Sequence, residues 1–131
     1  MRLMIVFSLI ASAAVADARE PLKNVPSIWN GLLNIGIANE IRETCPDISA
    51  RMLRATLRLN SIHNEAKSLG YSSEEIDAFR NSEANKAKMR AQGESYMTKN
   101  GVVAGDPDSY CALGRAEIAK SSQIGTLLRA N

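Results

Sequence analysis

Two cysteines, one histidine and a stripe of arginines are the side chains of this sequence with the most specific chemistry. A nucleophilic thiol needs a nearby base, and nothing in the sequence places the only histidine, His63, beside Cys45 or Cys111. Two cysteines in an exported chain most simply form one disulfide, and the N-terminal segment described below indicates export. We therefore interpret Cys45 and Cys111 as a structural disulfide.

His63 alone is weak evidence for a metal-binding site. A closed metal site usually needs four ligands, and His63 has neither a second histidine one turn away nor a cysteine pair with ligand spacing. We expect no metal and no cofactor, and a structural or half-exposed histidine. The alternative is that His63 titrates near neutral pH and acts as a pH-sensitive residue at a partner interface.

Arg51, Arg54 and Arg58 are spaced by three and four residues, which places them on one face of a helix. Three guanidiniums on one face can hold a carboxylate or a phosphate, so this stripe is a candidate anion or partner contact. The alternative is a solvated face that pairs with neighbouring carboxylates.

The sequence contains no recognisable catalytic motif: no GxSxG, no phosphate-binding glycine loop, no HExxH and no EF-hand. An enzyme would need a pocket that brings His63 together with Asp or Glu side chains. Nucleic acid is not an expected partner, because the formal charge is only +2 and falls to +1 when a segment containing Arg2 is removed. The basic run Lys86, Lys88 and Arg90 lacks interleaved aromatic residues and is typical of solvent-facing charge.

The first residues are typical of a signal peptide. Arg2 is followed by an apolar run, and Ala14-Val15-Ala16 has the small-x-small pattern of a cleavage site. The run is too short to cross a bilayer, which takes roughly 20 apolar residues. We expect residues 1–16 to be removed, or 1–18 if cleavage follows Ala18, leaving a chain without a membrane span in the periplasm or outside the cell.

The stretch from Cys45 to Gly70 must position the histidine and the arginines. Its apolar residues recur in steps of four and three, which predicts one helix whose seam is covered by a neighbouring helix. Pro46 precedes this helix, Asp47 or Ser49 is expected to cap it, and Gly70 is expected to take the left-handed turn that ends it. The seam consists of Ile48, Met52, Ala55, Leu59, Ile62, Ala66 and Leu69.

Four further helical segments are predicted around this one. They begin near Ile28, at the capping box of Ser72 and Glu75, at Ser82 and at the Asp106-Pro107 pair. The glycines of the first segment favour tight helix packing over a ligand groove. Whether residues 82–100 form one helix or two is left open. With residues 17–26 as an extended arm and 27–131 as a single helical domain, the prediction is an all-α bundle of four to five helices stapled by one disulfide.

The segments CPDISARMLRATLRLNSI and CALGRAEIAKSSQIGTLLRA resemble those of a family of small exported bacterial proteins known only as a domain of unknown function. The similarity runs from about Pro21 to the end of the chain. The resemblance implies a secreted helical domain with a cysteine in each segment, here Cys45 and Cys111. It implies no activity, substrate or catalytic residue.

The function expected from these patterns is a non-enzymatic interaction or accessory module of the periplasm. Its partner would be another periplasmic or membrane-complex protein, and its oligomeric state is left open. The expected contact residues are the arginine stripe, Tyr96 and Met97. The alternatives are a small-ligand binder or envelope stress chaperone, and an enzyme of unknown type.

Overall fold

The computed structural model describes residues 19–131, so the predicted signal peptide lies outside the described part. Helices dominate, as predicted, and one two-stranded sheet accompanies them. In the described residues no helix combines the length and apolar character that crossing a bilayer requires. The elements are α1 (Pro26–Thr44), β1 (Ile48–Ala50), α2 (Met52–Ser68), α3 (Ser73–Asn81), α4 (Glu83–Lys99), α5 (Pro107–Ala119) and β2 (Leu128–Ala130), with 3₁₀ turns at Leu22–Asn24 and Gly125–Leu127.

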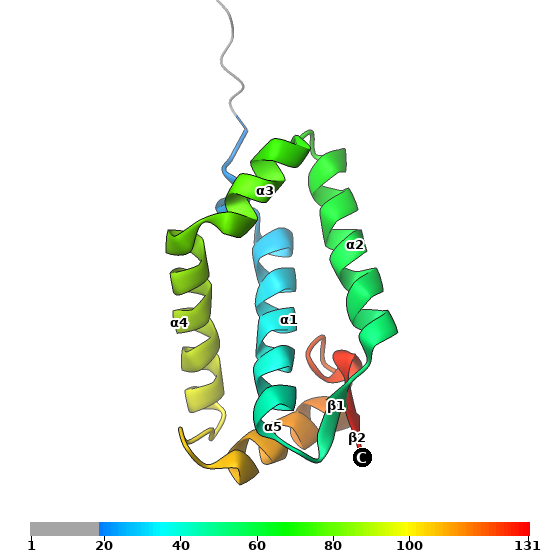
Figure 1. The fold of residues 1–131 in the computed structure, drawn as a ribbon, viewed down its shortest axis with the longest axis vertical. Coiled ribbons are helices and arrows are strands. Elements are labelled where there is room, and N and C mark those ends of the chain that lie inside the picture. Colours follow the sequence, from blue (N-terminus) through cyan, green and yellow to red (C-terminus); the bar gives the residue numbers. More distant parts are fainter. Residues whose placement is uncertain (1–18) are drawn as a thin grey trace, which may run out of the picture.

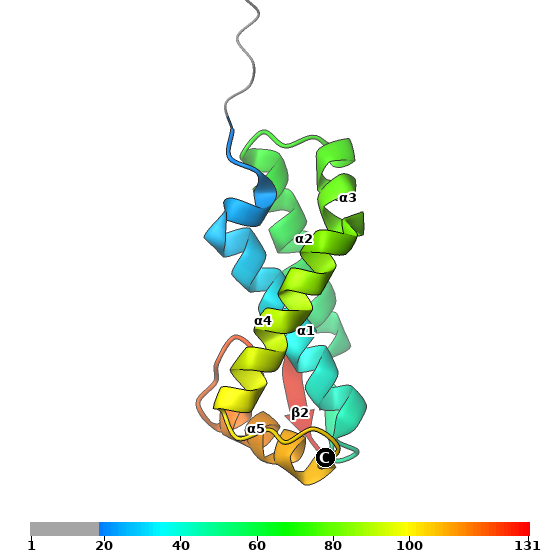
Figure 2. The ribbon, with the colours of Figure 1, turned by 90° about the vertical axis from the view of Figure 1, so that its left-hand side faces the viewer.

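Helix α1 is the centre of the molecule. Helices α2 and α4 stand on either side of it, α3 crosses one end and α5 crosses the other (Figure 1). Turning the molecule by a quarter shows α4 in front of α1 and α5 beneath both (Figure 2). Residues Ile28, Trp29, Ile37 and Ile41 of α1 are all buried, because the helix is covered on more than one side.

The apolar core has two parts, one at each end of α1. The first surrounds the cysteines and consists of Ile37, Ala38, Ile41, Cys45, Ile48, Met97, Val102, Cys111, Leu113, Ile124, Leu127 and Leu128. The second lies under α3 and consists of Leu22, Ile28, Ile62, Ala66, Tyr71 and Ile76. Ile35 packs against both, so α1 joins the two parts.

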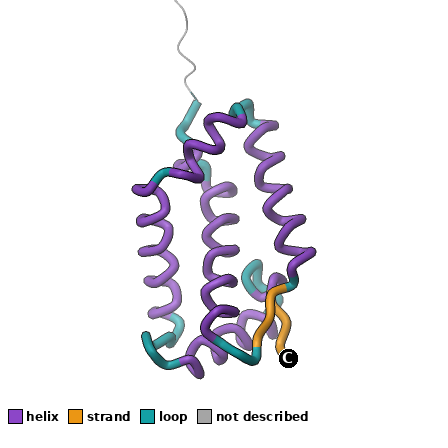
Figure 3. Tube along the Cα trace, in the orientation of Figure 1, coloured by secondary structure: helices purple, strands orange, loops and turns teal. Residues whose placement is uncertain are grey.

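The prediction that Ile48 begins the long helix is wrong. Residues Ile48–Ala50 form β1, which pairs antiparallel with β2 so that Ile48 faces Ala130 (Figure 3). The amide of Arg51 also donates to the carbonyl of Leu127, at 2.8 Å. The C-terminal segment therefore supplies the hydrogen bonds that a helical turn would otherwise make. Helix α2 begins at Met52 without a side-chain cap, so Asp47 and Ser49 are not its caps.

The predicted seam is buried only in part. Ile48, Ile62 and Ala66 are in the core, whereas Met52, Leu59 and Leu69 are exposed. Helix α2 approaches α1 closely at Gly31, where an added Cβ would lie 2.8 Å from Cδ1 of Ile62. Tight packing is thus the role of Gly31, as predicted, whereas the same prediction is wrong for Gly36, where an added Cβ would meet nothing within 4 Å.

Three predicted helix starts are confirmed, whereas the first helix begins at Pro26, two residues before the predicted Ile28. Ser72 and Glu75 form the capping box of α3, and the side chains of Ser82 and Asp106 cap α4 and α5. Residues 83–99 form one helix. Helices α2, α4 and α5 end in the same Schellman pattern, with a left-handed residue at Gly70, Gly101 and Ser121.

Candidate functional site

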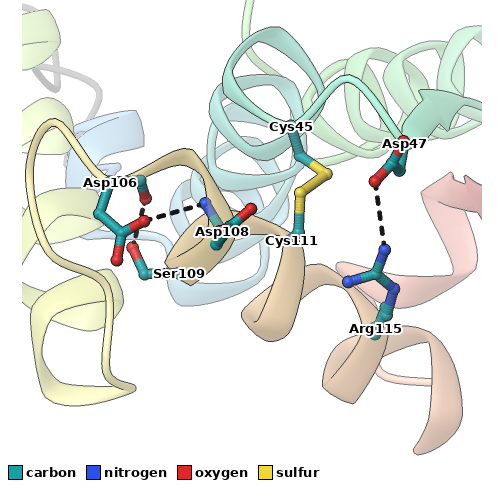
Figure 4. The surroundings of a disulfide bond; sticks show 7 residues. All are labelled: Cys45, Asp47, Asp106, Asp108, Ser109, Cys111 and Arg115. Atoms are coloured by element: carbon teal, nitrogen blue, oxygen red, sulfur yellow. Dashed lines mark hydrogen bonds and ion pairs between the residues drawn. A yellow bond between two sulfur atoms is a disulfide. The ribbon is translucent and has the colours of Figure 1, made fainter.

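The predicted disulfide is present. Cys45 ends α1 and Cys111 lies in α5, with their Cα atoms 5.2 Å apart. Both side chains are buried, and the bond joins two residues separated by 66 positions (Figure 4). A buried disulfide is protected from thiols in solution, so its role is structural.

One ion pair links the two segments that carry the disulfide, and local hydrogen bonds fix the start of α5. A guanidinium nitrogen of Arg115 lies 3.4 Å from Oδ2 of Asp47, and both side chains are half exposed (Figure 4). Asp106 accepts the amide of Asp108 at the start of α5, and Ser109 donates to the carbonyl of Asp106. Exposed ion pairs of this kind contribute little stability, so the disulfide dominates this junction.

The arginine stripe is divided among different neighbours. Nε of Arg51 donates to the carbonyl of Leu128 at 3.1 Å, and a terminal nitrogen of Arg54 donates to the carbonyl of Thr126 at 3.3 Å. Arg58 lies against Gly31 of α1. Two of the three guanidiniums thus tie α2 to the C-terminal segment, and the predicted anion or partner contact stays a prediction.

His63 lines a cavity of about 350 Å³ between α1, α2 and α3. We call it the His63 cavity. Among the described residues that line it there is no carboxylate, and no group of three or more potential ligands in the described part is arranged to hold a metal. Its lining is Leu22, Ile28, Leu32, Leu59, Asn60, Ile62, His63, Ala66, Ile76, Phe79 and Arg80.

An aromatic pair braces the wall of the His63 cavity. The rings of Trp29 and Phe79 meet edge to face with centroids 6.2 Å apart. The indole nitrogen of Trp29 donates to Oε1 of Gln92 at 2.6 Å, and Nζ of Lys88 lies 5.5 Å from the centre of the ring. Because Trp29 is held from α4 while Phe79 belongs to α3, three helices fix this wall.

The first two turns of α2 expose large apolar side chains. Met52, Leu53 and Leu57 are 65%, 74% and 58% exposed, and Leu59 is 42% exposed. We call these four residues the α2 apolar face. Met52 and Leu59 also border a groove of about 180 Å³, which continues over Ile35, Ala38 and Leu128 and has Arg42 at its edge.

A buried carboxylate that the sequence analysis missed lies beneath α4. Glu117 is completely buried and accepts a hydrogen bond from the hydroxyl of Tyr96, while Nζ of Lys120 lies 3.4 Å from the same carboxylate. Met97 is a buried core residue, so its predicted role as a contact residue is wrong, whereas Tyr96 is partly buried against the core and its contact role stays a prediction. The sequence did contain a signal for this burial. Cys111, Gly114 and Glu117 are spaced by three residues, so Glu117 lies on the same buried face of α5 as the cysteine.

Two pKa values are shifted in this cluster. Burial raises the pKa of Glu117, but hydrogen bonding by Ser122 and Tyr96 and the charge of Lys120 outweigh it, so the pKa lies below its ordinary value. The hydrogen bond to Glu117, followed by burial, raises the pKa of Tyr96 to about 12. The pair is therefore a carboxylate and a neutral phenol at neutral pH.

These shifts predict losses of stability at both extremes of pH. A carboxyl with a lowered pKa stabilises the fold above its unfolded value, near 4.5, and this contribution is lost as the pH falls. The raised pKa of Tyr96 contributes stability below about 10 that is lost as the pH rises to about 12. We expect Tyr96→Phe to flatten the alkaline decline of the thermal unfolding midpoint, measured by circular dichroism, and to shrink the acid decline. Tyr110→Phe is the matched control, and an alkaline decline unchanged in Tyr96→Phe would contradict the prediction.

Comparison with known proteins identifies one similarity. The model of a family described as "Family of unknown function (DUF5333)" matches residues 20–129. No curated protein and no solved structure matches the chain.

Proposed function

The chain belongs to this family of unknown function, DUF5333, and we propose that it is a non-enzymatic interaction module that works outside the cytoplasm and binds a partner protein through the α2 apolar face. The disulfide supports the compartment, because such bonds persist in oxidising environments. The predicted signal peptide supports export.

The exposure of the α2 apolar face is the observation that carries this proposal. Soluble proteins rarely leave several large apolar side chains together in water unless they bind something there. Met52 and Leu59 border the groove with α1, while Leu53 and Leu57 lie one turn apart on the adjoining side. An apolar helix of a partner can lie along this face and groove.

The positive charge around the α2 apolar face favours an acidic partner. Arg42 lines the groove, and Arg54 and Arg58 lie on the side of α2 next to Leu53 and Leu57. A partner helix with apolar residues on one side and carboxylates beside them would match both features.

Charge placed on the face tests the proposal. We expect Leu53→Glu with Leu57→Glu to reduce recovery of the partner at least tenfold when the tagged protein is used to capture proteins from envelope extract of its own organism. The fold should be unaffected, because both side chains are exposed. Recovery is measured by quantitative mass spectrometry.

The matched control is Ala87→Glu with Ala91→Glu, which adds the same charge at the same spacing to exposed positions of α4. Its recovery should equal that of the wild type. A partner recovered equally by all three proteins, or no specific partner with the wild type, would contradict the proposal.

A further inference from the structure

The His63 cavity shares Leu59 with the α2 apolar face, but its other lining residues are separate from that face, and it has the features of a small-molecule site. Its volume of about 350 Å³ is at the lower end of the range of ligand pockets in proteins, and most of its lining is aliphatic or aromatic. The braced pair of Trp29 and Phe79 keeps one wall in place without a ligand. A preformed wall lowers the cost of ordering the site when a ligand binds.

The polar side chains of the cavity are hydrogen-bond donors or cations. Asn60 and His63 are three residues apart on one side of α2, and Arg80 stands in the last turn of α3. In the described part of the chain none of these three side chains makes a hydrogen bond or ion pair with the protein. Each therefore has donors to offer to a ligand.

The charge of the lining distinguishes this cavity from two of its neighbours. Glu40 and Glu94 line the cavity between α1 and α4, and Glu20 and Glu75 line the one beside the N-terminal residues. Among the described residues of the His63 cavity, Arg80 is charged and no acidic side chain opposes it. An anion is therefore favoured here over a cation.

We propose that the His63 cavity binds a single-chain aliphatic carboxylate. The hydrocarbon chain lies against the apolar lining, and the carboxylate accepts hydrogen bonds from Arg80 and Asn60, with His63 beside them. Charge-assisted bonds from a guanidinium fit a carboxylate well. The cavity is too small for a lipid with two long acyl chains.

Direct binding measurements test this inference. The protein purified from cells that express the full chain is titrated calorimetrically with decanoate, with decanol and with decyltrimethylammonium. We expect saturable binding of decanoate, weaker binding of decanol and weakest binding of the cation. Arg80→Gln should weaken decanoate binding about fivefold, the effect expected for an ion pair made by an exposed arginine, and leave decanol binding unchanged.

Two further variants separate the cavity from the surface in general. Arg129→Gln removes the same charge from β2, which lies at the opposite end of the molecule from α3 (Figure 1), and this variant should bind decanoate as the wild type does. Leu32→Trp, which adds volume to a half-buried lining residue, should abolish binding of decanoate and decanol alike. Absence of saturable decanoate binding, equal losses in Arg80→Gln and Arg129→Gln, or undiminished binding in a folded Leu32→Trp protein would overturn the inference. Because none of these variants touches Leu53 or Leu57, failure here leaves the proposed partner binding intact.

Discussion

Replacing both Cys45 and Cys111 with alanine is expected to lower the free energy of unfolding by about 4 kcal/mol. The bond closes a loop of 66 positions, and the entropy of closing a loop of this length in the unfolded chain gives that figure. Small domains have total stabilities of roughly 5–15 kcal/mol, so the variant should be marginally folded. Urea unfolding followed by circular dichroism measures the change.

The same loss should appear without any substitution. Wild-type protein unfolded in the presence of a reductant should match the double variant, because both lack the cross-link in the unfolded state. The double variant itself should be insensitive to reductant. A loss below about 1 kcal/mol would show that the unfolded chain is already restricted by residual structure, and would contradict the structural role assigned to the bond.

Gly125→Ala is expected to destabilise the protein by about 3 kcal/mol or more. A Cβ at this position would lie 1.9 Å from the carbonyl oxygen of Glu117 and 2.6 Å from the amide nitrogen of Ile118. Both are backbone atoms of α5, so no side-chain rotation relieves the clash. The turn that carries Leu127 and Leu128 into the core must move instead, which combines overpacking with lost burial.

Gly36→Ala is the matched control for this substitution. A Cβ there meets nothing within 4 Å, and the residue lies inside α1. Alanine should therefore stabilise the protein by roughly 1 kcal/mol through helix propensity. The two variants are compared by urea unfolding at constant pH. Equal effects of the two alanines would show that the contact between Gly125 and α5 does not constrain the fold.

Local signals were sufficient to predict most of the helices. Caps and left-handed glycines depend on neighbours within a few residues, and the capping box of Ser72 and Glu75 and the turn at Gly70 were found for that reason. The disulfide was found because two cysteines allow one intramolecular pairing. The family resemblance agrees with the family match over residues 20–129.

Features that depend on distant residues were missed. Residues Ile48–Ala50 continue the helical spacing of α2, but their conformation is decided by β2, far along the chain. Glu117 can be buried because it accepts a hydrogen bond from the hydroxyl of Tyr96, which belongs to another helix. The spacing of apolar residues along α5 does not reveal that partner. The His63 cavity forms because α3 lies across α1 and α2, and no local pattern in the sequence indicates that arrangement. The sequence analysis therefore singled out His63 but not Arg80, which lines the same cavity.

The pairing of β1 with β2 also sets an order of events during synthesis. A ribosome delivers Cys45 and Ile48 long before Cys111 and Leu128, yet these residues belong to one apolar core. A nascent chain can therefore form its individual helices early but cannot close that core until Leu128 has emerged. During this interval the first thiol has no native partner.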